Sequence, residues 1–334
     1  MRVALVHDDL VQWGGAERVL EGICEIFPDA PIYTSVYDSE NIELKKRFGS
    51  RQIRTSFLQK IPFWKMFYKV FLPFYPIAFE QFNFDGYDLV ISNTTRFAKC
   101  IITKPTTKHV SYVHTPPRFL WHFSGQASYG IAEILMSWLR LLDQVTSSRV
   151  DYFLAGSKNA TERIKKIYRV DSKVVYPFVD LKRFKNIKTI DGDYFVVIGR
   201  PNKYKRFDLA REACSKLGLE LKTVSGGLKD SEVIEILAGC RALIIPGIED
   251  FGLTSLEAQA LGKPIIAYRE GGVLETIIEN QTGLFFDEPI VESLVESIKR
   301  FDSTNFNIEI IKDHAQKFSK ENFIRNFKQT VDSL

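Results

Sequence analysis

The chain has 334 residues, which is enough for about two domains of roughly 150 residues each. Hydrophobic residues make up 45% and charged residues 26% of it, a globular composition that excludes a wholly disordered, collagen-like or coiled-coil protein. The formal net charge of +4 is too small to indicate nucleic-acid binding by itself.

The four cysteines, Cys24, Cys100, Cys214 and Cys240, do not have metal-ligand spacing. We expect them to be reduced, buried thiols in a cytoplasmic protein, because a secreted chain of this length would carry more of them. The N-terminal apolar run ends at Asp8 and is too short for a signal peptide. No run approaches the roughly 18 apolar residues that cross a bilayer.

Short apolar runs alternate with segments of helical periodicity through the first half of the chain. Strands are predicted over residues 2–7, 88–92, 109–114 and 152–157. A turn at Gly14 and Gly15 leads from the first of these strands into a helix. Ser157 is expected to cap the helix that follows the last one.

The second half repeats this pattern, with strands predicted over residues 194–199, 220–227, 241–247, 264–268 and 283–286. A final helix is predicted over about 310–331. Continuous apolar strands separated by helices indicate parallel sheets covered on both faces. We therefore expect an α/β protein of two doubly wound, Rossmann-like domains facing across a cleft, with ligands at the carboxyl ends of the strands.

The predicted domains are residues 1–178 and 179–315, followed by a C-terminal helix, 316–334, that could pack back on the first domain. The net charge is +6 over residues 1–178 and −2 over the remainder. The first domain is therefore the better candidate to face an anionic partner.

The clearest chemical motif is PGIEDFGLTSLEAQALGKPIIAYREGG, residues 246–272. Glu249 follows a predicted strand, and Glu257 lies eight residues later in a helix that begins near Thr254. The free N–H groups of a helix N-terminus favour phosphate, and the two carboxylates can accept from sugar and ribose hydroxyls. The alternative is a capped helix with two solvated glutamates.

This segment resembles the Glu-x7-Glu motif of family-4 retaining glycosyltransferases of the GT-B fold. Residues 199–208 are similar to the Gly-Arg…Lys element of that family, and residues 13–19 to its N-terminal Gly-Gly loop. YVHTPPRFLW, residues 112–121, resembles the His-Thr-Pro stretch of a bacterial subgroup that builds O-antigens and related surface polysaccharides, often as mannosyltransferases. Four motifs in this order are specific for the family but not for the sugar.

The resemblance implies a role for each matching residue. Arg200 and Lys205 would hold the diphosphate, Glu257 the ribose, and Glu249 the sugar. The residues implied at the donor, from both domains, are Gly14, Gly15, Arg200, Lys205, Glu249, Asp250, Phe251, Gly252, Leu253, Thr254 and Glu257. His114 would act beside the reacting sugar, together with the catalytic charges of Glu249, Arg200 and Lys205.

Several assignments keep an alternative. Arg200 and Lys205 either bind phosphate or are surface cations after a strand, and Gly15 either approaches the donor or is a plain turn glycine. His114 is either functional or a packed core histidine, and Arg118 either binds an anionic acceptor or is a surface cation.

The sequence also departs from the family at two places, because Asp250 stands where many members have glycine and residues 224–230 lack the common Gly-x-Gly-Pro turn. The second departure leaves the nucleotide base open. Residues 191–193, Asp-Gly-Asp, superficially resemble the metal-binding Asp-x-Asp of the other glycosyltransferase fold, but they lie in the expected linker and are interpreted as a solvated turn.

The implied reaction is a metal-independent, cofactor-free hexosyl transfer with retention. The second domain would bind the nucleotide diphosphate sugar, with GDP-mannose as the leading donor, and the first would face a lipid-linked saccharide acceptor in surface-polysaccharide synthesis. The departing diphosphate could take the acceptor proton. Two alternatives remain open: a GT-B epimerase or hydrolase acting on the same donor, and a non-catalytic two-lobed nucleotide-sugar-binding protein.

A basic and aromatic segment follows Glu43 and contains no acidic residue before Glu80. Cations and aromatics alternate in it, among them Lys60, Trp64, Lys65 and Lys69. Because aromatics settle at headgroup depth while cations meet anionic lipid, we hypothesise that it docks the protein at the cytoplasmic face of the inner membrane. The alternative is aromatic core with a solvated basic face. Nucleic acid is a weaker use, since no recognition motif accompanies the segment.

Overall fold

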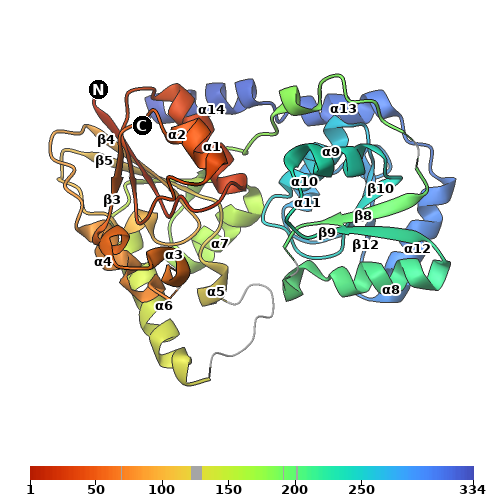
Figure 1. The fold of residues 1–334 in the computed structure, drawn as a ribbon, viewed down its shortest axis with the longest axis horizontal. Coiled ribbons are helices and arrows are strands. Elements are labelled where there is room, and N and C mark those ends of the chain that lie inside the picture. Colours follow the sequence, from red (N-terminus) through yellow and green to blue (C-terminus); the bar gives the residue numbers. More distant parts are fainter. Residues whose placement is uncertain (69, 122–129, 191, 201) are drawn as a thin grey trace. The chain divides into compact units, whose positions relative to one another are not determined.

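The computed structural model describes residues 1–68, 70–121, 130–190, 192–200 and 202–334 (Figure 1). The chain forms two compact units, each an α/β unit with a parallel sheet. The first holds the described residues up to Tyr176 together with Phe323–Leu334, and the second holds Pro177–Asn322. Two doubly wound α/β units were predicted, and the α/β class and the parallel sheets are confirmed.

The sheet of the first unit has the strand order β3-β2-β1-β4-β5-β6-β7. β1 pairs in parallel with both β2 and β4, so the winding direction reverses between β1 and β4. Its elements are β1 (Val3–His7), α1 (Gly15–Ile26), β2 (Ile32–Thr34), α2 (Ile42–Phe48), β3 (Ile53–Thr55), η1 (Phe57–Lys60), α3 (Trp64–Phe67), η2 (Leu72–Phe74), α4 (Tyr75–Glu80), β4 (Leu89–Thr94), η3 (Ala98–Cys100), β5 (Lys108–Val113), α5 (Arg118–Trp121), η4 (Gly130–Ala132), α6 (Glu133–Ser147), β6 (Tyr152–Ala155), α7 (Lys158–Tyr168) and β7 (Ser172–Val174).

The sheet of the second unit has the order β12-β11-β10-β8-β9, and its winding reverses between β8 and β10. Its elements, with the last helix of the chain, are η5 (Leu181–Phe184), β8 (Tyr194–Ile198), η6 (Lys203–Lys205), α8 (Phe207–Leu217), β9 (Glu220–Val224), α9 (Asp230–Ala238), β10 (Ala242–Ile245), α10 (Leu253–Ala260), β11 (Ile265–Tyr268), α11 (Val273–Thr276), β12 (Gly283–Phe286), α12 (Val291–Ser303), α13 (Ile308–Gln316) and α14 (Lys320–Asp332). Ligands of doubly wound folds bind at such a reversal, which directs attention to the residues after β1, β4, β8 and β10.

The strands that the apolar runs predict are present, because both faces of each sheet are covered and most positions of these strands are buried. The three-residue strands β2, β3 and β7 were not predicted. All residues of β4, β10 and β12 are buried. The four cysteines are free thiols and buried, as predicted. Ser157 caps α7 as expected, since its side chain accepts from the Ala160 N–H.

The predicted final helix is wrong in one respect. It consists of two helices, α13 and α14, separated by residues 317–319. The rings of Phe323 and Phe327 on α14 pack on the buried Tyr112 of β5, with centroids 6.3 and 6.1 Å away. The part of α14 from Phe323 onward therefore belongs to the first unit, and its buried residues join the core of that unit.

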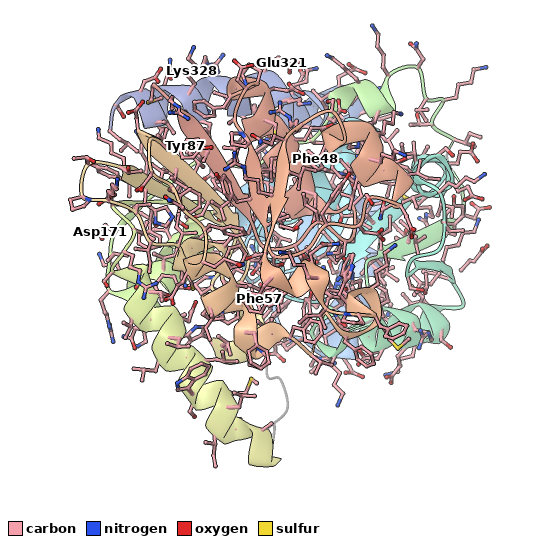
Figure 2. All side chains as sticks on the ribbon, turned by 60° about the vertical axis from the view of Figure 1, so that its left-hand side comes forward. Phe48, Phe57, Tyr87, Asp171, Glu321 and Lys328 are labelled. Atoms are coloured by element: carbon pink, nitrogen blue, oxygen red, sulfur yellow. The ribbon has the colours of Figure 1, made fainter. Side chains whose placement is uncertain are left out.

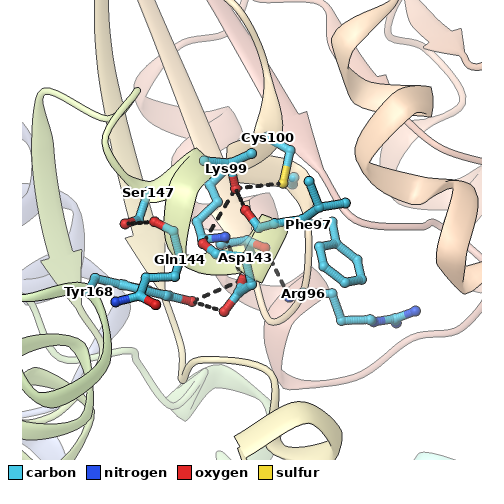
Figure 3. Close-up of polar contacts among 12 residues, drawn as sticks. Arg96, Phe97, Lys99, Cys100, Asp143, Gln144, Ser147 and Tyr168 are labelled. Carbon is cyan, nitrogen blue, oxygen red and sulfur yellow. Dashed lines mark hydrogen bonds and ion pairs between the residues drawn. The ribbon is translucent and has the colours of Figure 1, made fainter. Parts of the chain in front are cut away.

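A fully buried ion pair connects η3 to α6 (Figure 3). Lys99 Nζ lies 2.5 Å from Asp143 Oδ1, and both side chains are completely excluded from solvent. The Trp121 Nε1–H and the Tyr168 hydroxyl donate to the same carboxylate, at 2.8 and 3.0 Å. These bonds satisfy the buried charge of Asp143 and join α5, α6 and α7 to η3.

In the part of the chain that the structure describes, no helix is both long and apolar enough to cross a membrane.

Candidate functional site

In the second unit, residues predicted to bind the donor lie after β8 and β10. Arg200 is exposed in the segment that follows β8, and Lys205 is the last residue of η6. The Lys205 ammonium forms an ion pair with the carboxylate of Glu249, which follows β10. Their side chains are only 16% and 20% exposed. Two residues that the resemblance assigns to different parts of the donor thus lie in direct contact.

A glycine makes this contact possible. A Cβ at Gly247 would lie 2.0 Å from the carbonyl oxygen of Tyr204 and 2.8 Å from Cα of Lys205. No side chain fits there, because non-bonded heavy atoms do not approach so closely. Gly247 therefore lets η6 pack against the end of β10, which brings Lys205 to Glu249.

Helix α10 begins at Leu253, one residue before the predicted start. Its N-cap is Gly252, whose φ of +96° is in the left-handed region that favours glycine. Gly252 has no side chain with which to cap the first turn, and Phe251 before it is buried. The first turn, with Leu253 and Thr254, therefore presents backbone N–H groups suited to an anion at the carboxyl edge of the sheet.

Glu257, one turn into α10, has a partner that the sequence did not suggest. The Arg183 Nη1 lies 2.7 Å from Glu257 Oε1, and the Arg183 Nε donates to Asp230 at 3.0 Å. Burial would lower the pKa of Arg183, but Glu257 and Asp230 outweigh it and the pKa is raised. Arg183, from η5, thus fixes the position of the carboxylate that the resemblance assigns to the ribose.

In the first unit, the predicted His114 and Gly-Gly loop are joined by one amide. His114 follows β5, and its Nε2 lies 2.8 Å from Oδ1 of Asn93 near the end of β4. The Asn93 Nδ2 donates to the carbonyl oxygen of Ala16 at 2.8 Å. Ala16 comes directly after Gly14 and Gly15, which form the N-cap and first residue of α1. These predicted residues therefore lie together at the reversal between β1 and β4.

A buried pair lies behind Asn93. His7 Nδ1 is 3.0 Å from the backbone oxygen of Asn93, and His7 Nε2 is 3.6 Å from Glu17 Oε1. Burial lowers the pKa of His7, but the hydrogen bond and charge of Glu17 outweigh it and the pKa is raised. The two residues after His7 are also buried acids.

Asp8 and Asp9 hold the segment that follows β4. Asp8 is buried, yet Arg96 and its hydrogen bonds hold its pKa below the ordinary value. It accepts from Thr94 Oγ1 and from the N–H groups of Thr95, Phe97 and Ala98, at 2.6 to 2.9 Å. Asp9 pairs with Arg96 at 2.5 Å, and burial raises its pKa.

Sequence reasoning missed Asn93, His7, Glu17, Arg183 and Asp230. A signal was present for two of them, since His7 and Asn93 are polar residues at the ends of buried apolar runs. Arg183 lies 74 residues from Glu257 and outside any strand, so nothing local in the sequence connects them.

The basic and aromatic segment divides between core and surface. Trp64 packs partly buried against the core of the first unit, and Lys60 is exposed. Lys65 pairs with Asp38 at 2.8 Å and with Glu40. Arg118 is half-buried at the start of α5. Lys69 lies outside the described residues.

A cavity of about 580 Å³ in the second unit is not at the predicted donor residues. Its lining comes from η5, the end of α10 and α13, and includes Leu181, Phe184, Leu261 and Lys312. In the described part of the chain, His, Cys, Asp and Glu side chains form no group of three that could hold a metal ion. Asp191 lies outside that part.

Two family models match the chain. The model described as Glycosyltransferase Family 4 matches residues 13–183, and the model described as Glycosyl transferases group 1 matches residues 173–322. The alpha-1,3/1,6-mannosyltransferase ALG2 of Kluyveromyces lactis is 23% identical in an alignment that covers 100% of this chain and 85% of that protein.

Two solved structures share the fold over the full length of the chain. Sucrose-phosphate synthase from Thermosynechococcus elongatus has a TM-score of 0.76 at 15% identity and is covered to 99%. Anabaena Alr3699/HepE, solved in complex with UDP-glucose, has a TM-score of 0.68 at 16% identity and is covered to 100%. These likenesses show that the predicted GT-B fold is correct.

Proposed function

Because the chain belongs to glycosyltransferase family 4 and is a glycosyltransferase of the GT-B type, we propose that it transfers a hexosyl group, with retention and without a metal, from a nucleotide diphosphate sugar to a saccharide acceptor. The observation that carries this proposal is the ion pair of Lys205 and Glu249 beside the first turn of α10.

The pair suits a diphosphate leaving group. When the donor binds, Lys205 exchanges the Glu249 carboxylate for phosphate oxygens, and Glu249 is released to accept from a sugar hydroxyl. Arg200 adds a guanidinium fork from the segment after β8, and the N–H groups of Leu253 and Thr254 add dipoles. Cations and dipoles arranged in this way stabilise the negative charge that grows as the diphosphate departs.

The reaction exchanges one bond for another at the anomeric carbon. The bond from this carbon to the diphosphate oxygen breaks, and a bond to the acceptor oxygen forms on the same face of the sugar. The acceptor proton passes to the departing diphosphate, so a protein base is not required. His114 lies beside the sugar ring in this scheme and hydrogen-bonds one of its hydroxyl groups.

GDP-mannose is the proposed donor. The mannosyltransferase relative and the His-Thr-Pro stretch at residues 114–116 support mannose. The complex of HepE with UDP-glucose makes a uridine nucleotide the comparison to test.

A lipid-linked acceptor and a membrane surface are supported by apolar side chains that face solvent. Helix α6 buries Leu139 but exposes Ile134, Leu135, Trp138, Leu141 and Val145. Figure 2 shows this yellow-green helix extending away from the sheet of the first unit. The segment around α3 and α4 exposes Phe63, Met66, Phe67, Val70, Phe74 and Ile77.

Helices α4 and α6 both contact η3, so the two exposed apolar segments belong to the same part of the first unit. Exposed apolar side chains gathered in this way are typical of a surface that contacts a membrane or another protein. The exposed Lys45, Lys46 and Lys60 supply cations in the same unit. The proposed location is therefore the cytoplasmic face of the inner membrane, bound peripherally to anionic lipid.

A panel of nucleotide sugars tests the donor. At 100 times its dissociation constant, a ligand stabilises the folded protein by about 2.7 kcal/mol, so GDP-mannose, UDP-glucose, GDP and UDP can be ranked by thermal shift. Release of nucleoside diphosphate only in the presence of a saccharide acceptor supports transfer. Full donor consumption without acceptor indicates the epimerase or hydrolase, and binding without release indicates the two-lobed binding protein.

Vesicle flotation tests the membrane proposal separately. We expect the protein to float with vesicles containing phosphatidylglycerol at low salt, and Trp138→Asp with Leu141→Asp to abolish this. Leu228→Asp, at an exposed apolar residue of the second unit, is the matched control and should float normally. If the unaltered protein stays in the bottom fraction of the gradient, the membrane proposal is wrong, whichever nucleotide sugar the protein binds.

A further inference from the structure

The protonation of His114 follows from the orientation of Asn93. The carbonyl oxygen of Ala16 can only accept a hydrogen bond, so the amide nitrogen of Asn93 must face it, at 2.8 Å. The amide oxygen then faces His114 Nε2 at 2.8 Å, and that nitrogen must donate. A neutral His114 therefore carries its proton on Nε2, and Nδ1 is the nitrogen that can accept.

Asn93 is itself held through its backbone. Its carbonyl oxygen accepts from His7 Nδ1 at 3.0 Å, which places a proton on that nitrogen of His7. The Asn93 amide nitrogen also lies 3.1 Å from His7 Nδ1, but two donors cannot bond to each other. His7 therefore fixes the end of β4 and leaves the Asn93 amide to Ala16 and His114.

The outer nitrogen of His7 faces a carboxylate. His7 Nε2 lies 3.6 Å from Glu17 Oε1, and the two side chains are 2% and 5% exposed. The other charges that act on His7 are Asp8 and Asp9, and both acids interact with Arg96. Three carboxylates around one buried imidazole favour its doubly protonated form, in which both nitrogens donate.

Gly14 gives Glu17 the space for this contact. A Cβ at Gly14 would lie 3.1 Å from Glu17 Oε2, tighter than an ordinary contact. The Gly-Gly loop is thus part of the same arrangement as His114, although it lies 100 residues earlier in the chain.

We propose that Asn93 is a positioning residue that holds His114 with its proton on Nε2, supported by the buried His7–Glu17 pair. The consequence for transfer rests on the proposed function: a sugar hydroxyl that meets Nδ1 of the neutral His114 ring must donate its hydrogen bond to that nitrogen. The transferred sugar must therefore carry a hydroxyl group at that position. A nucleotide sugar with fluorine in place of this hydroxyl loses the interaction.

Nitrogen-15 spectra of histidine side chains in the full chain test the positioning role without any substrate. The His114 signals are assigned by their loss in His114→Gln. We expect Nε2–H to exceed Nδ1–H at least about tenfold in the unaltered protein, because the bond to Asn93 favours it. Asn93→Ala should reduce this excess toward the smaller intrinsic preference for Nε2–H of an unrestrained histidine, whereas Asn83→Ala, in an exposed loop, should preserve it.

Asn93→Asp is the second variant and keeps an acceptor of similar size. It should retain the Nε2–H tautomer and raise the pKa of His114, because a carboxylate stabilises the imidazolium. A predominant Nδ1–H form in the unaltered protein would overturn the proposal. So would an unchanged tautomer in a folded Asn93→Ala variant.

Transfer assays test the role of His114 at the sugar independently. If His114 acts in its neutral form, Asn93→Asp shifts the acid limb of kcat/KM toward higher pH by the same amount as its pKa in the spectra. A raised His114 pKa in Asn93→Asp with an unchanged pH profile refutes the role of His114 at the sugar but leaves its positioning by Asn93 intact. If the unaltered protein binds no nucleotide sugar, the proposed function is wrong, but the positioning of His114 by Asn93 is not affected.

Discussion

Arg183 Nη1 lies 2.7 Å from Glu257 Oε1, so the carboxylate proposed for the ribose is oriented before a nucleotide arrives. Because the side chain is already ordered, less conformational entropy is lost when the nucleotide binds.

We expect Glu257→Gln to weaken GDP binding about tenfold to a hundredfold, because a hydrogen bond to a charged acceptor is lost. Arg183→Ala should have a smaller effect in the same direction. Calorimetric titration gives the affinities, with Asp302→Asn at an exposed ion pair as the control. Repeating the titration with 2′,3′-dideoxy-GDP isolates the ribose, since Glu257→Gln should then have little effect. An equal loss for both nucleotides would place Glu257 elsewhere.

Lys205→Ala should discriminate between a diphosphate and a monophosphate. Removing the ammonium deletes a charge-assisted contact worth about 1.5–3 kcal/mol, so GDP affinity should fall about tenfold to a hundredfold while GMP is affected less. Lys216→Ala, which breaks an exposed ion pair with Glu292 in the same unit, should leave both affinities unchanged. Unchanged GDP binding by Lys205→Ala would remove this residue from the donor site.

The buried pair of Lys99 and Asp143 makes a prediction about stability (Figure 3). Lys99→Met should destabilise the first unit by about 3–5 kcal/mol, because the carboxylate remains buried without its cation. Lys99→Met combined with Asp143→Asn should cost much less than the sum of the single changes, since the charge is removed with its partner. Urea unfolding followed by circular dichroism measures the energies. Strict additivity would show that the two groups are not coupled.

His109 predicts a loss of stability in acid. It is fully buried in β5, and burial lowers its pKa from 6.5 to about 4. Between these values the unfolded chain binds a proton that the folded protein does not. The stabilising contribution is therefore complete above pH 6.5 and lost as the pH falls toward 4, and it amounts to about 3 kcal/mol.

His109→Gln supplies the comparison, because its amide can still bond to Ser92 but does not titrate. Urea unfolding from pH 7 to pH 4 should show a smaller loss of stability in this variant than in the unaltered protein. If stability falls equally with pH in the variant and the unaltered protein, burial does not lower the pKa of His109 in the folded state.

The strands of both sheets could be predicted because a buried strand is visible as a local apolar run. β2, β3 and β7 were missed because each has only three residues, too few to show a period. The break at residues 317–319 was missed because helical spacing of apolar residues continues across it. Burial in one unit or the other does not change that spacing.

Residues of the proposed donor site that lie in contiguous motifs could be predicted, but the contacts between them could not. Asn93 lies 21 residues from His114 and 86 from His7. The parallel register of β1, β4 and β5 brings the three together, and register is a property of the sheet and not of any one segment. Arg183 depends in the same way on the packing of η5 against α10.

The packing of Phe323 and Phe327 on Tyr112 also constrains biosynthesis. Because the first unit includes a segment that is translated after the whole of the second, its interior stays incomplete on the ribosome until residues 323–334 emerge from the exit tunnel. The second unit is contiguous and can finish folding earlier. Nascent chains that end at Asn322 and are tethered through a linker long enough to clear the tunnel should therefore be cleaved by protease in the first unit and protected in the second.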